Sequence, residues 1–379
     1  MDFNLTDEHQ HIRAEIRRFA EQELAPDAAE RDALEKFPHR QIRELGRLGY
    51  LGMTTSVQYG GQGSDMIAYA IVIEELSRVD ASAGVIVSVN NSLVCYGLEK
   101  FGSEALKQKY LMPLARGERL GAYCLSEPGT GSDAGNLQTT AERRGNHYLI
   151  NGTKNFITNG VHADNFIVFA TLDKAAGHKG VSAFLVEKGM PGFSVGKKEK
   201  KLGIRSSDTA MLNFDNVPVP AENLIGAERQ GFHIAMAILD CGRIGIAAQA
   251  VGIAQGALEA AVKYAKERVQ FGRPLADFQA IQFMLAEMAT AVEAARLLVY
   301  RAASLKDHGR DFSAAAAQAK LFASQVAVEC GVKAVQIYGG AGYLKDYPVE
   351  RIMRDARITE IYEGTSEIQK LVIARHLLK

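Results

Sequence analysis

The feature that most constrains the fold is a hydrophobic pattern whose period changes twice along the 379 residues. Up to about residue 118 the apolar side chains recur at helical spacing, and Thr6 is expected to cap the first helix. From about 121 to 226, short β-rich runs alternate with turn residues. Beyond 231 the helical spacing returns in long stretches with short links, which is typical of an antiparallel bundle.

We therefore predict a multidomain α+β fold in three parts. An all-α N-terminal domain would occupy residues 1–120, a central β-barrel-like domain 121–228, and a C-terminal four-helix-bundle domain 229–379. A chain of this length is too large for one ordinary core, so these domains should share an interior. Roughly six to eight strands are expected in the central part.

Local patterns also predict individual elements. The segment "RRGNHY" should form a hairpin, and "NVPVPAENLIG", with Pro218 and Pro220, should form an exit linker. Long helices are expected at 231–267, 277–308, 312–338 and 348–358, with a last helix from Thr365.

Charge and residue usage exclude several classes of function. Lys plus Arg and Asp plus Glu both number 44, and a net charge of zero argues against a nucleic-acid or anionic-membrane partner. The four cysteines are far apart in apolar segments, as expected of reduced thiols. Neither HExxH nor GxSxG occurs and the nine histidines do not cluster, so no metal site is expected.

The N-terminal and apolar segments bear on the compartment. "MDFNLTDEHQ" has no basic region and no apolar core, so no targeting peptide is expected. The chain is placed in the cytoplasm, with the mitochondrial matrix as the alternative only if a transit peptide was removed. The longest apolar stretch, residues 83–95, is interrupted by polar side chains and falls short of a membrane span.

The segment "CLSEPGTGSDAG", residues 124–135, follows a predicted strand. Its glycines let backbone N–H groups approach an anion, and Ser126, Thr130 and Ser132 offer hydroxyls, which suits a phosphate or a flavin edge. An ordinary glycine-rich turn explains the residue types equally well. The spacing is not GxGxxG, so a Rossmann nicotinamide site is disfavoured.

The segment "NGTKNFITNG", residues 151–160, is expected to be a strand between glycine turns. Alternation along a strand would put Phe156 and Thr158 on one face, where they could contact a planar ring. Simple packing on a sheet face is the commoner explanation for such a pair.

Two helical segments carry charged residues whose role the pattern leaves open. Asp240 and Arg243 in "LDCGRIGIA" are three positions apart, which favours an ion pair. In "ERVQFGRPLADFQAIQ", Arg268, Arg273 and Gln279 flank a helix break and suit a pyrophosphate, although helix ends carry arginine routinely.

Two C-terminal segments complete the set. In "QIYGGAGYLKDYPVERIMRD", residues 336–355, three glycines separate two helices, and as an isolated string this is an interhelical turn. In "EIYEGTSEIQK", residues 360–370, Glu363 and Gly364 precede the capping types Thr365 and Ser366. Glu363 is therefore either a surface cap or a catalytic base.

Taken together, these segments resemble the acyl-CoA dehydrogenase family. "CLSEPGTGSD" and "QIYGGAGYLKDYPVERIMRD" look like its two signatures, and "IYEGTSEIQ" is similar to its catalytic segment. The helical, β, helical order matches the family over essentially the whole chain. "SVNNSL", "LDCGRIGIA" and "IYEGTSEIQ" most resemble the short-chain, butyryl-CoA-type enzymes.

The resemblance implies FAD-dependent α,β-dehydrogenation of an acyl-CoA thioester. Glu363 would remove the α-proton while the β-hydrogen leaves as hydride to flavin N5. The Glu363 backbone N–H and a flavin ribityl hydroxyl would polarise the thioester carbonyl. Burial beside an apolar acyl chain should raise the pKa of the Glu363 carboxyl towards the working pH. The electrons would pass to an electron-transfer flavoprotein.

The resemblance also assigns the other site residues. FAD would be lined by Tyr123, Leu125, Ser126, Gly131, Ser132, Phe156, Ile157 and Thr158, and touched at the last helix by Thr365, Ser366 and Glu367. The substrate would contact Ser132, Asp240, Arg243 and Gly364. A neighbouring subunit would supply Arg268, Phe271, Gln279, Gln336, Ile337, Gly339 and Gly340 to the same FAD. A homo-oligomer, with a tetramer favoured, is therefore expected.

Two departures from the family pattern matter. Isovaleryl and long-chain members carry the base at the place of Gly242, so here Glu363 is the candidate that remains. Many relatives have tryptophan where this chain has Phe156, so an indole N–H contact to the flavin is lost. Alternatives left open are an oxygen-using flavin oxidase of the same fold, a branched-chain or cyclic acyl-CoA dehydrogenase, and a silent binding scaffold.

Overall fold

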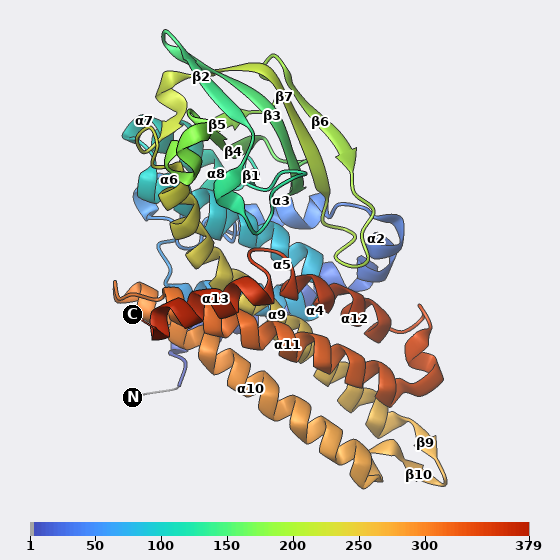
Figure 1. Ribbon diagram of the computed structural model, residues 1–379. Helices are drawn as coiled ribbons and strands as arrows, with labels where there is room; N and C mark the ends of the chain where they lie inside the picture. Colours follow the sequence, from blue (N-terminus) through green and yellow to red (C-terminus); the bar gives the residue numbers. More distant parts are fainter. Residues whose placement is uncertain (1–3, 379) are drawn as a thin grey trace.

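The computed structural model describes residues 4–378 and has the expected order of helices, sheet and helices (Figure 1). Thr6 caps the first helix as predicted, because its Oγ1 accepts a hydrogen bond of 3.2 Å from the His9 N–H. The N-terminal helices are α1 (Asp7–Phe19), α2 (Ala28–Leu34), α3 (His39–Arg47), α4 (Met66–Val79), α5 (Ala81–Ser88), α6 (Tyr96–Phe101), α7 (Glu104–Leu106) and α8 (Met112–Ala115).

A π-helical turn, η4 (Val89–Cys95), joins α5 to α6. Its two buried asparagines bind backbone groups that would otherwise lack partners. Asn90 Nδ2 donates to Leu51 O at 2.8 Å, and Asn90 Oδ1 accepts from Gly121 N at 2.9 Å. This turn therefore connects the helical layer to the first strand of the sheet. π-helical turns of this kind are frequent at functional sites.

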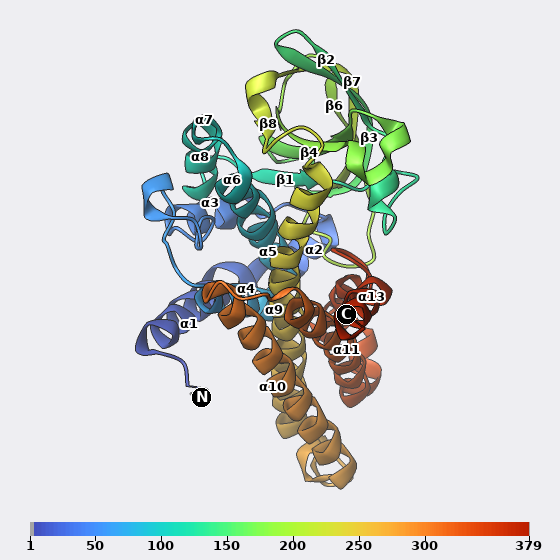
Figure 2. The same cartoon turned by 60° about the vertical axis from the view of Figure 1, so that its left-hand side comes forward.

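The central part is one mixed sheet of eight strands, in agreement with the expected number. The strand order is β6-β7-β3-β2-β4-β5-β8, and β1 pairs in parallel with β4. Figure 2 shows the sheet curling round on itself. The strands are β1 (Gly121–Cys124), β2 (Thr140–Arg144), β3 (His147–Thr158), β4 (Asn165–Thr171), β5 (Val181–Glu187), β6 (Phe193–Lys198), β7 (Thr209–Pro220) and β8 (Leu224–Ile225).

The predicted hairpin at "RRGNHY" is confirmed, since Arg144 on β2 pairs with His147 on β3. The glycine turn expected near Gly152 is wrong, because β3 runs through this residue as one bulged strand. Gly152 has φ of 147°, and a Cβ there would lie 2.5 Å from Thr139 Oγ1. A glycine therefore serves a bulge rather than a turn.

The predicted exit linker at Pro218 and Pro220 is also wrong. Both prolines belong to β7 and pair with β3 opposite Leu149 and His147. The pairing of β6 with β7 extends only to Phe214, so the outer edge of β7 is free beyond that point. Proline is tolerated where a strand edge has no neighbour, because the missing N–H is then not required.

The C-terminal helices begin and end within two residues of the predicted positions. They are α9 (Gly231–Glu267), α10 (Gln279–Asp307), α11 (Ser313–Tyr338), α12 (Val349–Ala356) and α13 (Ser366–Leu377). A two-residue turn between β9 (Val269–Gln270) and β10 (Arg273–Pro274) joins α9 to α10. Phe271 and Gly272 in this turn have φ of 52° and 77°, as a type I′ hairpin requires.

Two helical stretches, Ala81–Phe101 and Gly231–Glu267, are long and apolar enough to cross a membrane by length and composition alone. Their apolar windows are 94% and 78% buried inside the protein. This burial is typical of core helices, because the apolar faces already pack against other parts of the same chain.

Helix α9 is the central packing element of the structure. Figure 2 shows it running from beneath the sheet down through the middle of the molecule. Two of its glycines meet the backbone of α4 directly: a Cβ on Gly252 would lie 2.2 Å from Glu74 O, and one on Gly256 would lie 2.3 Å from Arg78 O. The two helices can approach this closely only because glycine has no side chain.

We expect Gly252→Val to lower the thermal midpoint of unfolding, because the new side chain must push α4 and α9 apart. Overpacking of this kind costs about 1–3 kcal/mol of unfolding free energy, and contact with rigid backbone puts this site at the upper end. Scanning calorimetry would measure the change. Ala289→Val on the exposed face of α10 is the matched control. Equal midpoints for the two variants would contradict the packing argument.

Candidate active site

A cavity of about 660 Å³ opens where the three parts of the fold meet. Its walls come from η4, β1, β3, the segments after β1 and β6, α9, and the start of α13. Most of the predicted flavin and substrate residues line it together: Tyr123, Leu125, Ser126, Gly131, Ser132, Phe156, Ile157, Thr158, Arg243, Glu363, Gly364 and Thr365. Residues from segments more than two hundred positions apart thus converge on one cavity.

An aromatic side chain in the cavity wall belongs to Phe156, whose backbone is strained. Phe156 has φ of 58° and its side chain is 64% exposed. A bulky residue in this left-handed region is an outlier that persists where the surroundings impose it. The bulge between Lys154 and Ile157 breaks the strand alternation. Phe156, Ile157 and Thr158 all line the cavity, as the family resemblance implied, but strict alternation, from which Phe156 and Thr158 were expected on one face, does not hold here.

A buried ion pair fixes the glycine-rich segment to this strand. Lys154 Nζ lies 2.8 Å from Glu127 Oε1 and donates to Leu125 O at 3.1 Å. Glu127 also accepts hydrogen bonds from the Gln138 and Thr139 N–H groups, at 2.6 and 3.0 Å. Burial alone would raise the pKa of Glu127, but Lys154 and these donors hold it below its usual value. Sequence reasoning missed both residues, because each stands among polar and turn-forming neighbours that predict exposure.

Glu363 lies in the turn before α13. Thr365 is the N-cap, as predicted, because its Oγ1 accepts a hydrogen bond of 3.3 Å from the Ile368 N–H. Glu363 itself is not the cap: its φ is 50°, and its buried Oε2 has no hydrogen-bond partner within residues 4–378. The carboxylate is therefore directed inwards and remains available to an incoming group.

Gly242 on α9 makes room for this carboxylate. A Cβ at position 242 would lie 2.3 Å from Glu363 Oε2 and 2.6 Å from Leu93 Cδ2. The sequence indicated only that glycine cannot act as a base. The structure adds that any side chain here would displace the carboxyl group of Glu363.

The electrostatics of Glu363 are those of a buried acid near two cations. Burial raises its pKa from the ordinary value of 4.5 to about 7, against the opposing influence of Lys320 and Arg243. Arg243 is 4% exposed, and burial lowers its pKa. Its guanidinium pairs with Asp240, which also accepts a hydrogen bond of 3.1 Å from Ser313 Oγ. The ion pair predicted from spacing is confirmed, and Arg243 rather than Asp240 lines the cavity.

The residues assigned to a neighbouring subunit lie away from this cavity. Arg268, Phe271 and Gln279 surround the β9–β10 hairpin at the far end of α9 (Figure 1). Phe271 is 93% exposed there. Gln336 and Ile337 lie in the last turn of α11, and Gly339 and Gly340 follow directly after this helix. Their contribution to an FAD site of another copy stays a prediction.

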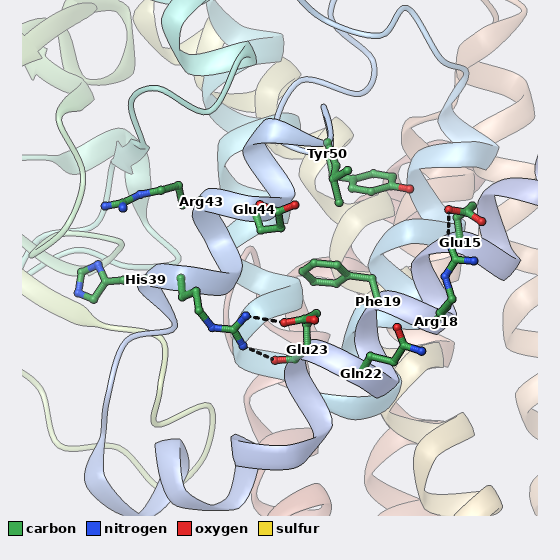
Figure 3. A pocket seen from close by; sticks show the side chains of 11 residues that line it. Glu15, Arg18, Phe19, Gln22, Glu23, His39, Arg43, Glu44 and Tyr50 are labelled. Atoms are coloured by element: carbon green, nitrogen blue, oxygen red, sulfur yellow. Dashed lines mark hydrogen bonds and ion pairs between the residues drawn. The ribbon is translucent and has the colours of Figure 1, made fainter.

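A second cavity, of about 640 Å³, lies between α1 and α3 (Figure 3). Its charged residues largely pair with each other: Arg18 lies 2.6 Å from Glu15, and Arg40 lies 2.5 Å from Glu23. Such pairs are typical of a solvated surface. Across the described part of the chain, no group of three His, Cys, Asp or Glu residues is arranged to hold a metal ion.

Comparison with known proteins covers nearly the whole chain. Family models described as acyl-CoA dehydrogenase N-terminal, middle and C-terminal domains match residues 6–118, 122–217 and 229–378. The short-chain specific acyl-CoA dehydrogenase of Clostridium acetobutylicum is 54% identical, with full coverage of both chains.

Two solved structures have the same fold over all of the chain and of their own length. Butyryl-CoA dehydrogenase from Megasphaera elsdenii is 49% identical with a TM-score of 0.99. A chain from the work on the electron transferring flavoprotein of Acidaminococcus fermentans is 53% identical, also with a TM-score of 0.99.

The raised pKa of Glu363 predicts a pH-dependent cost to stability. Between 4.5 and about 7 the folded protein keeps a proton that the unfolded chain has lost, so stability falls as the pH rises through this window. Glu363→Gln removes the effect. At pH 8 we expect it to raise the unfolding free energy by on the order of 2 kcal/mol after solvent screening, with little change at pH 4.5.

Denaturant titrations at several pH values would measure this difference. Glu118→Gln, a surface carboxylate, is the control. A Glu363→Gln gain that is independent of pH would contradict the raised pKa.

Proposed function

Since the chain belongs to the acyl-CoA dehydrogenase family, we propose that it oxidises a short-chain, butyryl-CoA-like thioester to trans-2-enoyl-CoA, with Glu363 as the base. It is an acyl-CoA dehydrogenase and its cofactor is FAD. The observation that carries the proposal is the carboxyl group of Glu363, whose inner oxygen is buried without a partner in the wall of the cavity.

The residues present fit FAD. Phe156 presents an exposed aromatic face to the cavity at a position of backbone strain, as expected where a planar group completes the packing. Thr130 Oγ1 and Ser366 Oγ are buried and have no partner in the part of the chain that the structure describes. We propose that the flavin is bound by Tyr123, Leu125, Ser126, Gly131, Ser132, Phe156, Ile157, Thr158, Thr365, Ser366 and Glu367.

In this proposal Glu363 takes the α-proton of the thioester. Its pKa of about 7 makes it a stronger base than an ordinary glutamate, while half or more of it is still ionised at neutral pH and above. The backbone N–H of Glu363 polarises the thioester carbonyl as the proton leaves. When bound, FAD supplies the acceptor for the hydride from the β-carbon. Leu93, Val89 and Tyr362 wall the cavity with apolar groups and exclude water.

The substrate end of the cavity is built by α9 and η4. We assign the CoA moiety to Arg243 and Asp240, of which Arg243 faces the cavity and Asp240 pairs with it, and the thioester region to Ser132 and Gly364. Leu93 is buried beside Glu363, since a Cβ on Gly242 would lie 2.6 Å from Leu93 Cδ2 and 2.3 Å from Glu363 Oε2. In this proposal the acyl chain lies against Leu93 when its α-carbon reaches the carboxylate, so a large side chain here favours a short substrate.

Electrons leave to a partner flavoprotein in this proposal. The chain from the Acidaminococcus fermentans work on electron transferring flavoprotein is similar over its full length. We further propose a homo-oligomer, a tetramer, in which Arg268, Phe271, Gln279, Gln336, Ile337, Gly339 and Gly340 of one copy reach the FAD of the next. Their clustering at one end of the bundle, remote from the cavity of their own chain, supports this arrangement (Figure 1).

We expect the purified protein to be yellow, and anaerobic butyryl-CoA to bleach the flavin without nicotinamide. Glu363→Gln should retain FAD and ligand binding but lose turnover by roughly 10²–10⁴-fold, because the base is lost. Flavin absorbance and steady-state assays would measure both. Full activity in Glu363→Gln, or no bleaching with any short or medium acyl-CoA, would refute the proposal.

We expect Leu93→Ala to shift the preference towards longer acyl chains, because it lengthens the apolar cavity. Each methylene accommodated in such a pocket changes kcat/KM by roughly tenfold or more. The ratio of kcat/KM for hexanoyl-CoA to that for butyryl-CoA measures the shift. Leu98→Ala, a buried leucine of α6 outside the cavity, should leave this ratio unchanged. An unchanged ratio in Leu93→Ala would show that Leu93 does not limit chain length.

A further inference from the structure

Two buried side chains hold the backbone of the Glu363 turn. Lys320 on α11 is fully buried, and its Nζ donates a hydrogen bond of 2.7 Å to Gly364 O. Gln369 on α13, also fully buried, donates from Nε2 to Gly364 O at 2.8 Å and to Glu363 O at 3.4 Å. The carbonyl groups of the turn are thus anchored from two helices.

This anchoring matters because the turn is strained. Glu363 and Gly364 have φ of 50° and 91° in succession. A left-handed conformation at a residue other than glycine costs about 1–3 kcal/mol and persists only when its surroundings impose it. A Cβ on Gly364 would lie 2.6 Å from Gln369 Nε2, so this contact is close-packed. Without the anchors, Glu363 would relax and its carboxyl group would move.

Lys320 also carries a buried charge that, within the described chain, is not paired in a salt bridge. No carboxylate in residues 4–378 lies within 4.0 Å of its ammonium group, so a buried cation stands beside the turn without a salt bridge. Burial lowers the pKa of Lys320 to about 8, and Glu363 is the strongest influence that opposes this shift. Reciprocally, Lys320 lowers the pKa of Glu363 more strongly than Arg243 does.

We propose that Lys320 is a positioning residue for the base, holding the Glu363 turn through its hydrogen bond to Gly364 and favouring the ionised carboxylate through its charge. This inference rests on the proposed role of Glu363. It adds a residue that lies outside the cavity wall and acts on the reaction through its neighbour.

Several other titratable or charged groups face Glu363 and Lys320, and the test variants must leave them unchanged. Those that interact with Glu363 or Lys320 electrostatically come from every packed element: Tyr69 of α4, Tyr123 of β1, Cys241 and Arg243 of α9, Glu360 and Tyr362 of the preceding segment, and Glu367 of α13. None of them donates a hydrogen bond to the Glu363 or Gly364 carbonyl groups, a role confined in the described chain to Lys320 and Gln369.

Two substitutions separate the hydrogen bond from the charge. Lys320→Gln keeps a donor near Gly364 O and removes the charge, whereas Lys320→Met removes both. Loss of a cation raises the pKa of a nearby acid, so the ascending limb of kcat against pH should move to higher pH by roughly one unit in both variants. Lys320→Met should also lose plateau kcat by roughly 10²-fold, because the base is misplaced.

Lys333→Met is the matched control, since it removes a lysine of the same helix whose partners are Glu287 and Glu329. It should leave both the limb and the plateau unchanged. A merely structural role for Lys320 would lower activity at every pH without moving the limb, and that result would overturn the proposal. Restoration of the wild-type limb by Lys320→Arg would support it, and failure of a folded Lys320→Arg to restore it would count against it.

A reciprocal measurement leaves Lys320 intact, so it decides the matter even if the Lys320 variants fail to fold. In Glu363→Gln holoenzyme, the ammonium loses the carboxylate that favours its charged form. NMR titration of labelled lysine side chains should then show Lys320 deprotonating at lower pH than in the wild type. An unchanged titration would overturn the inference. Wild-type turnover by Glu363→Gln would instead refute the proposed function.

Discussion

The site depends on the close approach of α9 to its neighbours. Gly252 and Gly256 on this helix meet the backbone of α4, and Gly242 meets the carboxyl group of Glu363. A methyl group at any of these positions would fall inside van der Waals contact. Glycines at different positions of one helix therefore let two core helices pack closely and leave the space in which an acid lies against the helix backbone.

Burial then decides the chemistry of the charged groups. Lys154 and Glu127 form a compact buried pair with several additional hydrogen bonds, so both can stay charged and fix a loop to a strand. Glu363 has no such partner at its inner oxygen, and burial raises its pKa to about 7. Low dielectric surroundings make a satisfied ion pair rigid and leave an unsatisfied acid poised to exchange a proton.

Sequence patterns predicted the structure well where a residue's neighbours along the chain decide its conformation. Helical periodicity placed α9 to α13 within two residues, and the Thr6 and Thr365 caps followed from residue type at a pattern boundary. They failed where long-range pairing overrode them. The prolines of β7 were interpreted as a linker, and Gly152 was interpreted as a turn. Both predictions were wrong because a free strand edge or a bulge can be recognised only when the neighbouring strands are known.

By itself the sequence determined the order of the three parts and the absence of hydrolase motifs, since these depend on spacing and residue chemistry. It left Glu363 as either a cap or a base, and the resemblance to the family favoured the base. Only the tertiary structure decided what surrounds that base. Lys320 is 43 positions away from Glu363 in an alanine-rich segment that gave no signal, and Gly242, 121 positions away, was marked only as a residue that cannot act as a base. Their effects on conformation and charge act through space over a few ångströms, and chain folding alone sets which residues come that close.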